Sequence, residues 1–258
     1  MKLTVLNDNT AGRICPAEFG LSFLLEEDKK VLFDLGPSDI FIRNAKALNI
    51  SLEDIDCIVL SHGHWDHGNG LKFIKNKKLI CHPDCFIKRY LKKDDAYIGM
   101  PLTLEEAKNN FELILIKDPY QISQNIIFLG EIPRKNSFES TKTPFYKDEK
   151  KDDFVMDDSA IAINSQKGLI IITGCSHAGI CNIAEHAKKV TGIEKIHAVI
   201  GGFHLKYAGE ITGRTIEYFK KEKIEKIYPS HCTELPALSK FYEAFKIEQI
   251  HSGDVIRL

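Results

Sequence analysis

Apolar and polar positions in the first half of the chain alternate mainly as β-strands do. Short apolar runs rich in β-branched residues predict buried strands at residues 3–5, 20–25, 30–34, 56–60, 79–82, 111–116 and 126–129. Ile42, Ala45 and Leu48 have helical spacing, and Ser38 can cap that helix. Residues 70–74 predict the first turns of another helix. Thr103 and Glu106 have the spacing of a capping box.

The second half shows the same change from strand to helix patterns. Two strands at 159–164 and 168–173 predict a hairpin, because residues 166–168 suit a turn. Further helices and strands follow in alternation: helix 180–190, strand 196–200, helix 216–223, strand 226–228, helix 236–245 and strand 254–258. Strands followed by helices, twice over, predict two sheets packed face to face with helices outside.

Composition limits the class of protein. With 258 residues and 43% hydrophobic residues, the chain is expected to form one domain over residues 1–258 with a sizeable core. The net charge of −1 gives no basic field for nucleic acid. Residues 1–5 do not resemble a signal peptide, and no apolar run is long enough to span a bilayer. These features predict a cytoplasmic protein without a membrane partner, and they leave a homo-oligomer open.

The cysteines agree with that compartment. There are 7, an odd number, and their spacing shows no disulfide framework. Most thiols are therefore expected to be free.

One stretch, residues 133–158, differs from the rest. It is polar, rich in Lys and Asp, and carries isolated aromatic residues: Phe138, Phe145, Tyr146 and Phe154. Two interpretations remain open. The stretch is either a solvated insertion or a lid that lays aromatic rings over a substrate.

Potential metal ligands are most concentrated in residues 61–68. His62, His64, Asp66 and His67 place four metal-competent side chains within six positions. The small Gly63 beside them and the strand before them predict a tight strand-to-helix loop. On such a loop His62 and His64 can point to one metal, while Asp66 and His67 point to a neighbouring one. All four are good ligands for zinc, iron or manganese; the alternative is a merely polar loop.

The pattern His-x-His-x-Asp-His resembles the signature of the metallo-β-lactamase superfamily of metallohydrolases. This resemblance implies an α/β fold, a four-layer αββα sandwich, with the metals at one edge. Four blocks are similar to a narrower group of metal-dependent hydrolases, some of them named 7,8-dihydropterin-6-methyl-4-(β-D-ribofuranosyl)aminobenzene 5′-phosphate synthase: residues 130–134, 174–179, 201–205 and 231–233. The similarity covers nearly the whole chain and bears on fold and metal more than on substrate.

The resemblance assigns further residues. Asp34, in an Asp-x-Gly sequence at the end of a strand, is implied to support the metal loop through hydrogen bonds, although a turn residue would look the same. His231, after the strand at 226–228, looks like the last ligand and would complete the second metal with Asp66 and His67. A structural histidine is the alternative there.

The chain departs from the commonest pattern at Cys175, where many members carry an aspartate that bridges both metals. Cys175 is either a soft ligand to the second metal or a buried thiol. His177 is the first choice for the remaining imidazole of the first metal, ahead of Asp157 and Asp158. His204 follows a buried strand and could bind substrate, donate a proton or ligate metal.

The main functional hypothesis is a binuclear hydrolase with two divalent metals, zinc first and iron or manganese as alternatives. A metal-activated water would attack a small anionic substrate, with phosphate esters the leading class. Asp66 would orient the nucleophile or take its proton. His204 and Arg134 would hold the anionic group.

Two alternatives come from the same resemblance. A transferase would join a pterin diphosphate to a ribofuranosyl-aminobenzene phosphate with loss of pyrophosphate, and aromatic residues of 133–158 would stack on the pterin. A non-hydrolytic metal or redox module is the third hypothesis. Flavodiiron proteins share the fold but normally carry a glutamate where this chain has His64.

Overall fold

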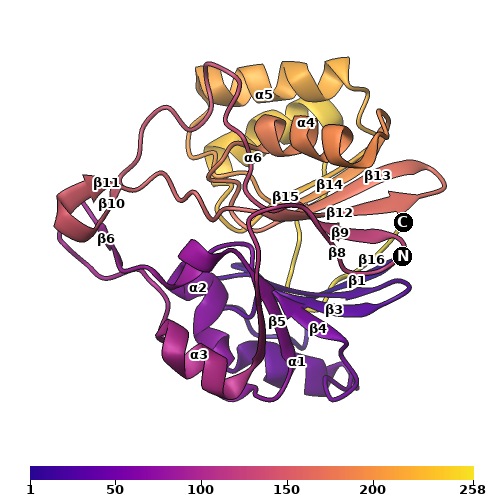
Figure 1. The fold of residues 1–258 in the computed structure, drawn as a ribbon. Helices are drawn as coiled ribbons and strands as arrows, with labels where there is room; N and C mark the ends of the chain where they lie inside the picture. The colour runs from indigo at the N-terminus through magenta and orange to yellow at the C-terminus, as the bar shows by residue number, and fades with distance from the viewer. The chain divides into compact units, whose positions relative to one another are not determined.

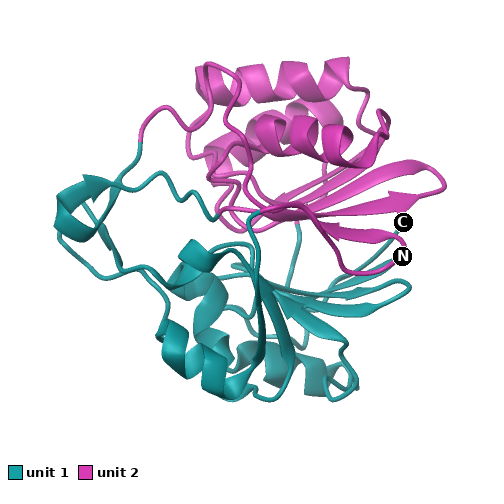
Figure 2. Ribbon diagram, viewed as in Figure 1, with its two compact units in different colours: residues 1–117, 143–157, 250–258 teal, residues 118–142, 158–249 magenta.

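The computed structural model describes all 258 residues and divides into two compact units (Figure 2). Unit 1 comprises residues 1–117, 143–157 and 250–258, and unit 2 comprises residues 118–142 and 158–249. The stretch at 133–158 is thus shared between the units. One domain with a lid in this stretch stays a prediction.

Unit 1 is built on a seven-stranded mixed sheet in the order β16-β1-β2-β3-β4-β5-β7. Neighbouring strands from β3 to β7 run parallel, and the others are antiparallel. The strands are β1 (Lys2–Asn7), β2 (Ser22–Glu26), β3 (Lys30–Phe33), β4 (Cys57–Val59), β5 (Lys78–Cys81), β7 (Glu112–Leu115) and β16 (Val255–Arg257). Their nearly continuous apolar runs are typical of strands buried on both faces, and most of their residues are buried.

Helices lie along one side of this sheet in Figure 2. They are α1 (Ile40–Ala47), α2 (Trp65–Gly68) and α3 (Leu104–Asn110). Unit 1 also contains the 3₁₀ helices η1 (Asn69–Phe73), η2 (Pro83–Phe86) and η3 (Asp148–Lys150). Phe41 of α1 packs in a core cluster with strand residues such as Leu32 and Ile58. The predicted capping box is confirmed: Thr103 Oγ1 accepts from the Glu106 N–H, and the Glu106 carboxylate accepts from the Thr103 N–H.

A small second sheet of unit 1 was not predicted. Its strands are β6 (Arg89–Leu91), β10 (Phe145–Lys147) and β11 (Lys151–Asp152). Tyr90 stacks on Tyr146, with ring centroids 5.2 Å apart, and Phe145 packs with Ile98 and Val155. Two of the aromatic residues in the stretch at 133–158 therefore contribute to packing within unit 1.

Unit 2 is built on a six-stranded sheet in the order β15-β14-β13-β12-β9-β8. The strands are β8 (Tyr120–Gln121), β9 (Ile126–Phe128), β12 (Ala160–Ser165), β13 (Gly168–Thr173), β14 (Ile196–Gly202) and β15 (Lys226–Ser230). The predicted hairpin is confirmed by the antiparallel β12–β13 pair, whereas β13, β14 and β15 run parallel. The carboxyl ends of these three parallel strands therefore lie at one edge of the sheet.

Three helices cover one face of this sheet: α4 (Ile180–Thr191), α5 (Glu210–Lys221) and α6 (Leu235–Phe245) (Figure 1). Helix α4 packs on β12 and β13, and α5 packs against α4 and α6. Phe203, Phe219 and Phe241 meet in the core, with ring centroids 5.6 to 5.8 Å apart. None of the helices combines the length and the apolar character that a membrane-spanning helix requires.

Some predicted boundaries were wrong. The helix expected at 70–74 begins earlier, at Trp65, because the N–H groups of His67 and Gly68 both bond to the His64 carbonyl, and residues 69–73 form a 3₁₀ helix. Helix α5 begins at Glu210 rather than 216. Its first turns bury Thr212 and Thr215, whose hydroxyls donate to backbone carbonyls. Because these buried residues are polar, the sequence shows no apolar helical pattern there.

Candidate functional site

In unit 1, Asp34 anchors the loop that carries the histidines. It directly follows β3 with a left-handed backbone (φ 55°) and is fully buried. One carboxylate oxygen accepts from the Ser61 N–H at 2.7 Å. The other accepts from the Ser61 hydroxyl and from His67 Nδ1, both at 2.7 Å. Because Asp34 accepts from Nδ1–H, Nε2 carries the lone pair of the neutral His67 ring.

Three imidazoles and one carboxylate gather on this loop. His62 Nε2 lies 3.0 Å from His64 Nδ1, and the His62 and His67 ring centroids are 4.3 Å apart. His67 Nε2 lies 3.7 Å from an Asp66 oxygen. All four side chains are buried. Two imidazole nitrogens at 3.0 Å have to share a proton or a cation, because two facing lone pairs repel.

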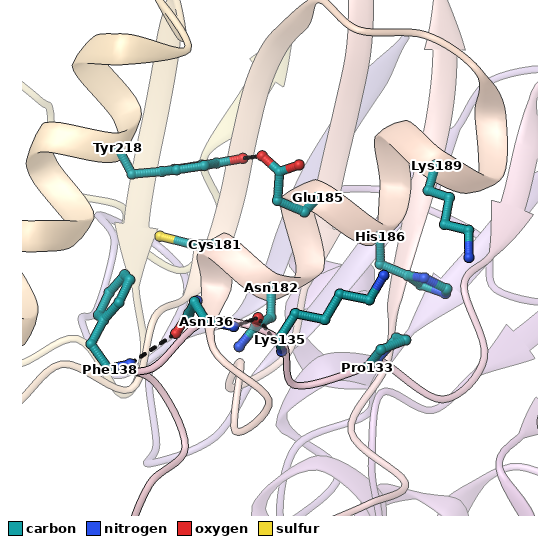
Figure 3. Close-up of a pocket in the computed structure, with 10 residues that line it drawn as sticks. All are labelled: Pro133, Lys135, Asn136, Phe138, Cys181, Asn182, Glu185, His186, Lys189 and Tyr218. Carbon is teal, nitrogen blue, oxygen red and sulfur yellow. Dashed lines mark hydrogen bonds between the residues drawn. The ribbon is translucent and has the colours of Figure 1, made fainter.

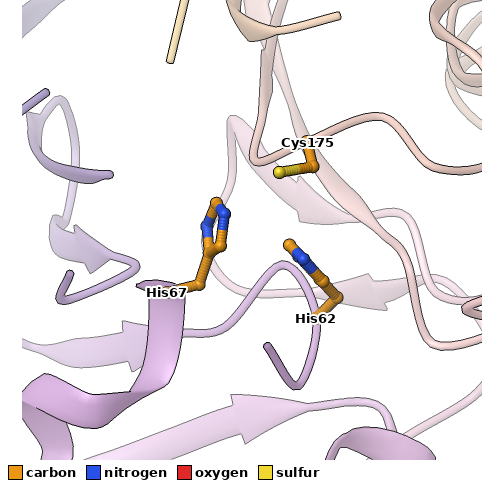
Figure 4. A group of neighbouring side chains, drawn as sticks. All are labelled: His62, His67 and Cys175. Atoms are coloured by element: carbon orange, nitrogen blue, oxygen red, sulfur yellow. The ribbon is translucent and has the colours of Figure 1, made fainter. Parts of the chain in front are cut away.

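Figure 4 shows the His62 and His67 side chains extending in the same direction from their backbone; it also draws Cys175, which belongs to unit 2. In each ring, a neighbouring side chain holds the Nδ1 atom by a hydrogen bond. Asp34 holds Nδ1 of His67, and the Ser61 hydroxyl lies 2.8 Å from Nδ1 of His62. Hydrogen bonds of this kind set the tautomer and the orientation of metal-ligating histidines.

Gly63 is required by close packing inside the loop. A Cβ at this position would overlap the carbonyl oxygen of Cys85. The Gly63 N–H donates to Asp157 at 2.7 Å. The loop is therefore fixed by backbone contacts as well as by Asp34.

The Asp157 carboxylate that binds Gly63 belongs to a network of buried charged residues. Arg89 is fully buried and donates to both oxygens of Asp157, at 2.9 and 2.6 Å, while its Nε lies 3.0 Å from Asp153. Burial alone would raise the pKa of Asp157, but the charge and hydrogen bonds of Arg89, helped by Gly63, hold it below the usual range. Asp157 was weighed as a metal ligand from the sequence. In the structure its carboxylate is instead engaged by Arg89.

In unit 2, the candidate residues follow the carboxyl ends of the parallel strands β13, β14 and β15. His204 and His231 both have left-handed backbones (φ 49°), as does Ser176 (φ 60°). Such conformations are uncommon outside glycine and cluster at functional sites. The loops are tied together: Gly202 N–H donates to the Gly174 carbonyl, and Ser176 Oγ donates to the Gly202 carbonyl.

These loops bring together a second set of donor groups. Ligand atoms of Cys175, His177 and His204 lie within 4.8 Å of one another, and so do those of Cys175, His231 and Cys232. The His204 Nδ1 atom is buried and has no hydrogen-bond partner. A thiolate and imidazole set with an unsatisfied buried nitrogen suits a borderline or soft divalent cation such as zinc or iron.

Cys232 is the member of this set that the sequence did not single out. It is buried next to His231. Burial raises the pKa of its thiol, but hydrogen bonds with Cys175 and His204 and the charges of His231 and His204 outweigh burial, so the net pKa lies below the ordinary value. The available signal was its position directly after a strand-end histidine, which alone does not separate a ligand from a packed thiol.

The remaining predicted residues lie elsewhere or make other contacts. Asp158 accepts from the Ala178 N–H at 2.9 Å. The Arg134 guanidinium donates to Ser140 and to the Ile132 carbonyl within its own segment, so its role toward a substrate stays a prediction. The other histidines have local hydrogen-bond partners: His82 with Asp84, His186 with Leu129, His197 with Glu225 and His251 with Asp254.

Comparison with known proteins agrees with these features. The family model described as metallo-beta-lactamase superfamily matches residues 15–82. A protein of Methanocaldococcus jannaschii described as uncharacterized protein MJ0448 is 37% identical over 98% of this chain and 99% of its own length. A second protein of that organism is 36% identical over 100% of this chain and 96% of its own length, and is named 7,8-dihydropterin-6-methyl-4-(beta-D-ribofuranosyl)-aminobenzene-5'-phosphate synthase.

A solved structure extends the comparison to the whole fold. The crystal structure of Tm1679, described as a metal-dependent hydrolase of the beta-lactamase superfamily, is 27% identical. It superposes with a TM-score of 0.90 over 100% of this chain and 99% of its own. The predicted α/β, metallo-β-lactamase-like fold is thereby confirmed. The chain belongs to the metallo-β-lactamase superfamily, in the group that includes the dihydropterin ribofuranosylaminobenzene phosphate synthase.

Proposed function

We propose that this protein is a binuclear metal-dependent hydrolase acting on a phosphate ester or another small anionic molecule. The observation that carries the proposal is the loop of unit 1 on which His62, His64, Asp66 and His67 converge behind Asp34. Four buried donors with fixed orientation are costly to keep together without a cation. Family membership supports the same chemistry.

The proposal assigns ligands as follows. His62, His64 and His177 would hold the first cation, and Asp66, His67 and His231 would hold the second, with Cys175 as an additional soft donor. Zinc is the preferred metal, and iron and manganese are the alternatives. Bound there, the cations would lower the pKa of a water toward neutrality and would stabilise developing negative charge.

The protein's own side chains would position the water and the substrate and would transfer protons. The Asp66 carboxylate, next to His67, orients the nucleophilic water or accepts its proton. The His204 imidazole would donate a proton or hold a substrate oxygen, and its buried nitrogen without a hydrogen-bond partner supports this role. Arg134 supplies a guanidinium for an anionic group, which suits planar, bidentate recognition of phosphate.

Asp34→Asn tests the support of His67. The amide keeps the size of the side chain but removes the charge that fixes the His67 ring, so zinc affinity is expected to fall about 10–100-fold. Competition with a chelator measures this affinity, and urea unfolding checks that the fold is kept. Unchanged affinity in a folded variant would remove Asp34 from the metal support.

Cobalt substitution separates a ligating Cys175 from a buried thiol. Thiolate ligands to cobalt(II) give an intense near-ultraviolet charge-transfer band, which imidazole and carboxylate ligands do not. We expect this band in the cobalt protein and its loss in Cys175→Ser. Cys232→Ser is the matched control, since it removes the other thiol of the set. A band that persists in Cys175→Ser and disappears in Cys232→Ser would transfer the role to Cys232.

A transferase is the second candidate function, and one observation favours it. The relative named as the dihydropterin ribofuranosylaminobenzene phosphate synthase is 36% identical over the whole of this chain. In this version the cations would stabilise a departing pyrophosphate instead of activating water, and a pterin diphosphate would be one substrate.

Metal content of the purified protein, measured together with phosphate monoester and diester hydrolysis, tests the proposal. About two metals per chain with hydrolysis supports the hydrolase. The same metal content without hydrolysis of any ester favours the transferase, which is then assayed with a pterin diphosphate. Absence of metal after reconstitution with zinc, iron and manganese would exclude both.

A further inference from the structure

Unit 2 contains a pocket of about 420 Å³ along one face of helix α4 (Figure 3). None of its lining residues is among the candidate metal ligands. One wall is the segment around Asn136. The opposite side is formed by Tyr218 of α5.

The wall around Asn136 is held rigidly against α4. Asn182 Oδ1 accepts from the N–H groups of Lys135 and Asn136, at 2.9 and 3.1 Å. The buried Glu139 carboxylate accepts from the N–H groups of Cys181 and Asn182 in the first turn of α4. The pocket is therefore formed without a ligand, as binding sites usually are.

One end of the pocket is cationic. Lys135 and Lys189 line it, whereas the neighbouring Lys188 is paired with Glu185 and Glu222. His186 lies with them. Its Nε2 is 3.0 Å from the Leu129 carbonyl, whereas its Nδ1 is buried and has no hydrogen-bond partner. Burial lowers the pKa of His186, and the nearby charges of Lys189 and Lys135 lower it further. The neutral ring therefore presents the lone pair of Nδ1.

The other end is aromatic and already balanced in charge. Figure 3 shows Phe138 and Tyr218 on the side away from Lys189. The Tyr218 hydroxyl donates to Glu185 at 2.6 Å, and Lys188 pairs with the same carboxylate. Arg214 lies over the Phe138 ring, with its Cζ 4.3 Å from the centroid. The charged side chains at this end therefore already have partners within the protein.

We propose that this pocket binds a phosphate monoester whose organic part is a flat ring. The phosphate lies between Lys135 and Lys189, where it supplies the missing negative charge. One phosphate oxygen shares a proton with His186 Nδ1, which satisfies that buried nitrogen. The ring packs against Phe138 and Tyr218. This inference does not rest on the proposed function, because it uses none of the metal ligands.

Phenylphosphonate is the probe, because its carbon–phosphorus bond resists a phosphoesterase. Isothermal titration calorimetry compares the metal-loaded wild type with Lys135→Ala/Lys189→Ala, and with Lys167→Ala/Lys226→Ala as a control of equal charge change. The control lysines are exposed and lie outside the pocket. We expect at least about tenfold weaker binding in the first variant, since two charge-assisted contacts are lost, and wild-type binding in the control.

Two further measurements sharpen the result. Methylphosphonate, which lacks the ring, is expected to bind several times more weakly than phenylphosphonate. His64→Ala is expected to keep the pocket's binding event, so that failure of the metal site and failure of this pocket are told apart. The inference is overturned by an absence of binding at millimolar phenylphosphonate, or by an affinity and stoichiometry that Lys135→Ala/Lys189→Ala leaves unchanged.

Discussion

Replacement of His64 by alanine is expected to lower the rate of ester hydrolysis more than about 100-fold, and to leave the protein with less than its full metal content. Even loss of a group that only supports a ligand weakens metal binding or activity by about 10–100-fold, and His64 is proposed as a direct ligand. Its Nδ1 lies 3.0 Å from His62 Nε2, and its removal takes away one of the three imidazoles proposed to hold the first cation. Metal analysis and steady-state kinetics measure the two effects.

His251→Ala is the matched control for this experiment. It removes an imidazole that bonds to Asp254, near the end of the chain and outside the donor sets. Its metal content and rate should equal those of the wild type. A His64→Ala protein that retains both metals and the full rate would contradict the assignment of His64.

Arg89→Met is expected to reduce the free energy of unfolding by about 3–5 kcal/mol, because loss of one partner leaves buried charges uncompensated. Methionine has similar length, so the cavity is small, but Asp157 and Asp153 lose their cation. Asp157 also accepts from the N–H of Gly63, so the change is expected to disturb the loop that carries His62 and His64 as well. Urea unfolding measures the loss.

The pH dependence of the difference in unfolding free energy between the wild type and Arg89→Met identifies the cause of the destabilisation. In the wild type the pKa of Asp157 is held below the usual range, so this contribution is present near neutral pH and is lost as pH falls through the lowered pKa. Without Arg89, burial raises the pKa of Asp157, and the folded variant gains stability relative to the wild type as pH falls. The stability gap should therefore narrow on acidification. Arg89→Met/Asp157→Asn should recover part of the loss at neutral pH; a constant gap and no recovery would argue against an uncompensated carboxylate.

The main elements of the fold could be predicted because their signals are local. The β12–β13 hairpin and helix α4 are each written within a short window of sequence. The small sheet could not be predicted, because β6 and β10 pair across more than fifty residues of chain and are only three residues long. Pairing at such separation leaves no periodic pattern to detect.

The residues of the candidate site also differ in how far the sequence could predict them. His62, His64, Asp66 and His67 stand close together in sequence, so their chemistry is visible at once. The Arg89–Asp157 pair spans 68 residues, and each member alone looks like an ordinary surface charge. Cys232 lies between these cases, since only the folding together of the loops after β13 and β15 brings its sulfur near Cys175.

The closing strand β16 has a consequence for synthesis of the chain. It forms the edge of the unit 1 sheet beside β1, and the amino group of Met1 donates to the carbonyl of Leu258, 257 residues away. Contacts of such separation form late. While the ribosome is still making unit 2, β1 would therefore keep an unpaired edge, which is a template for association with other chains. The nascent chain is thus expected to be most prone to association through β1 until residues 255–257 have paired with that edge.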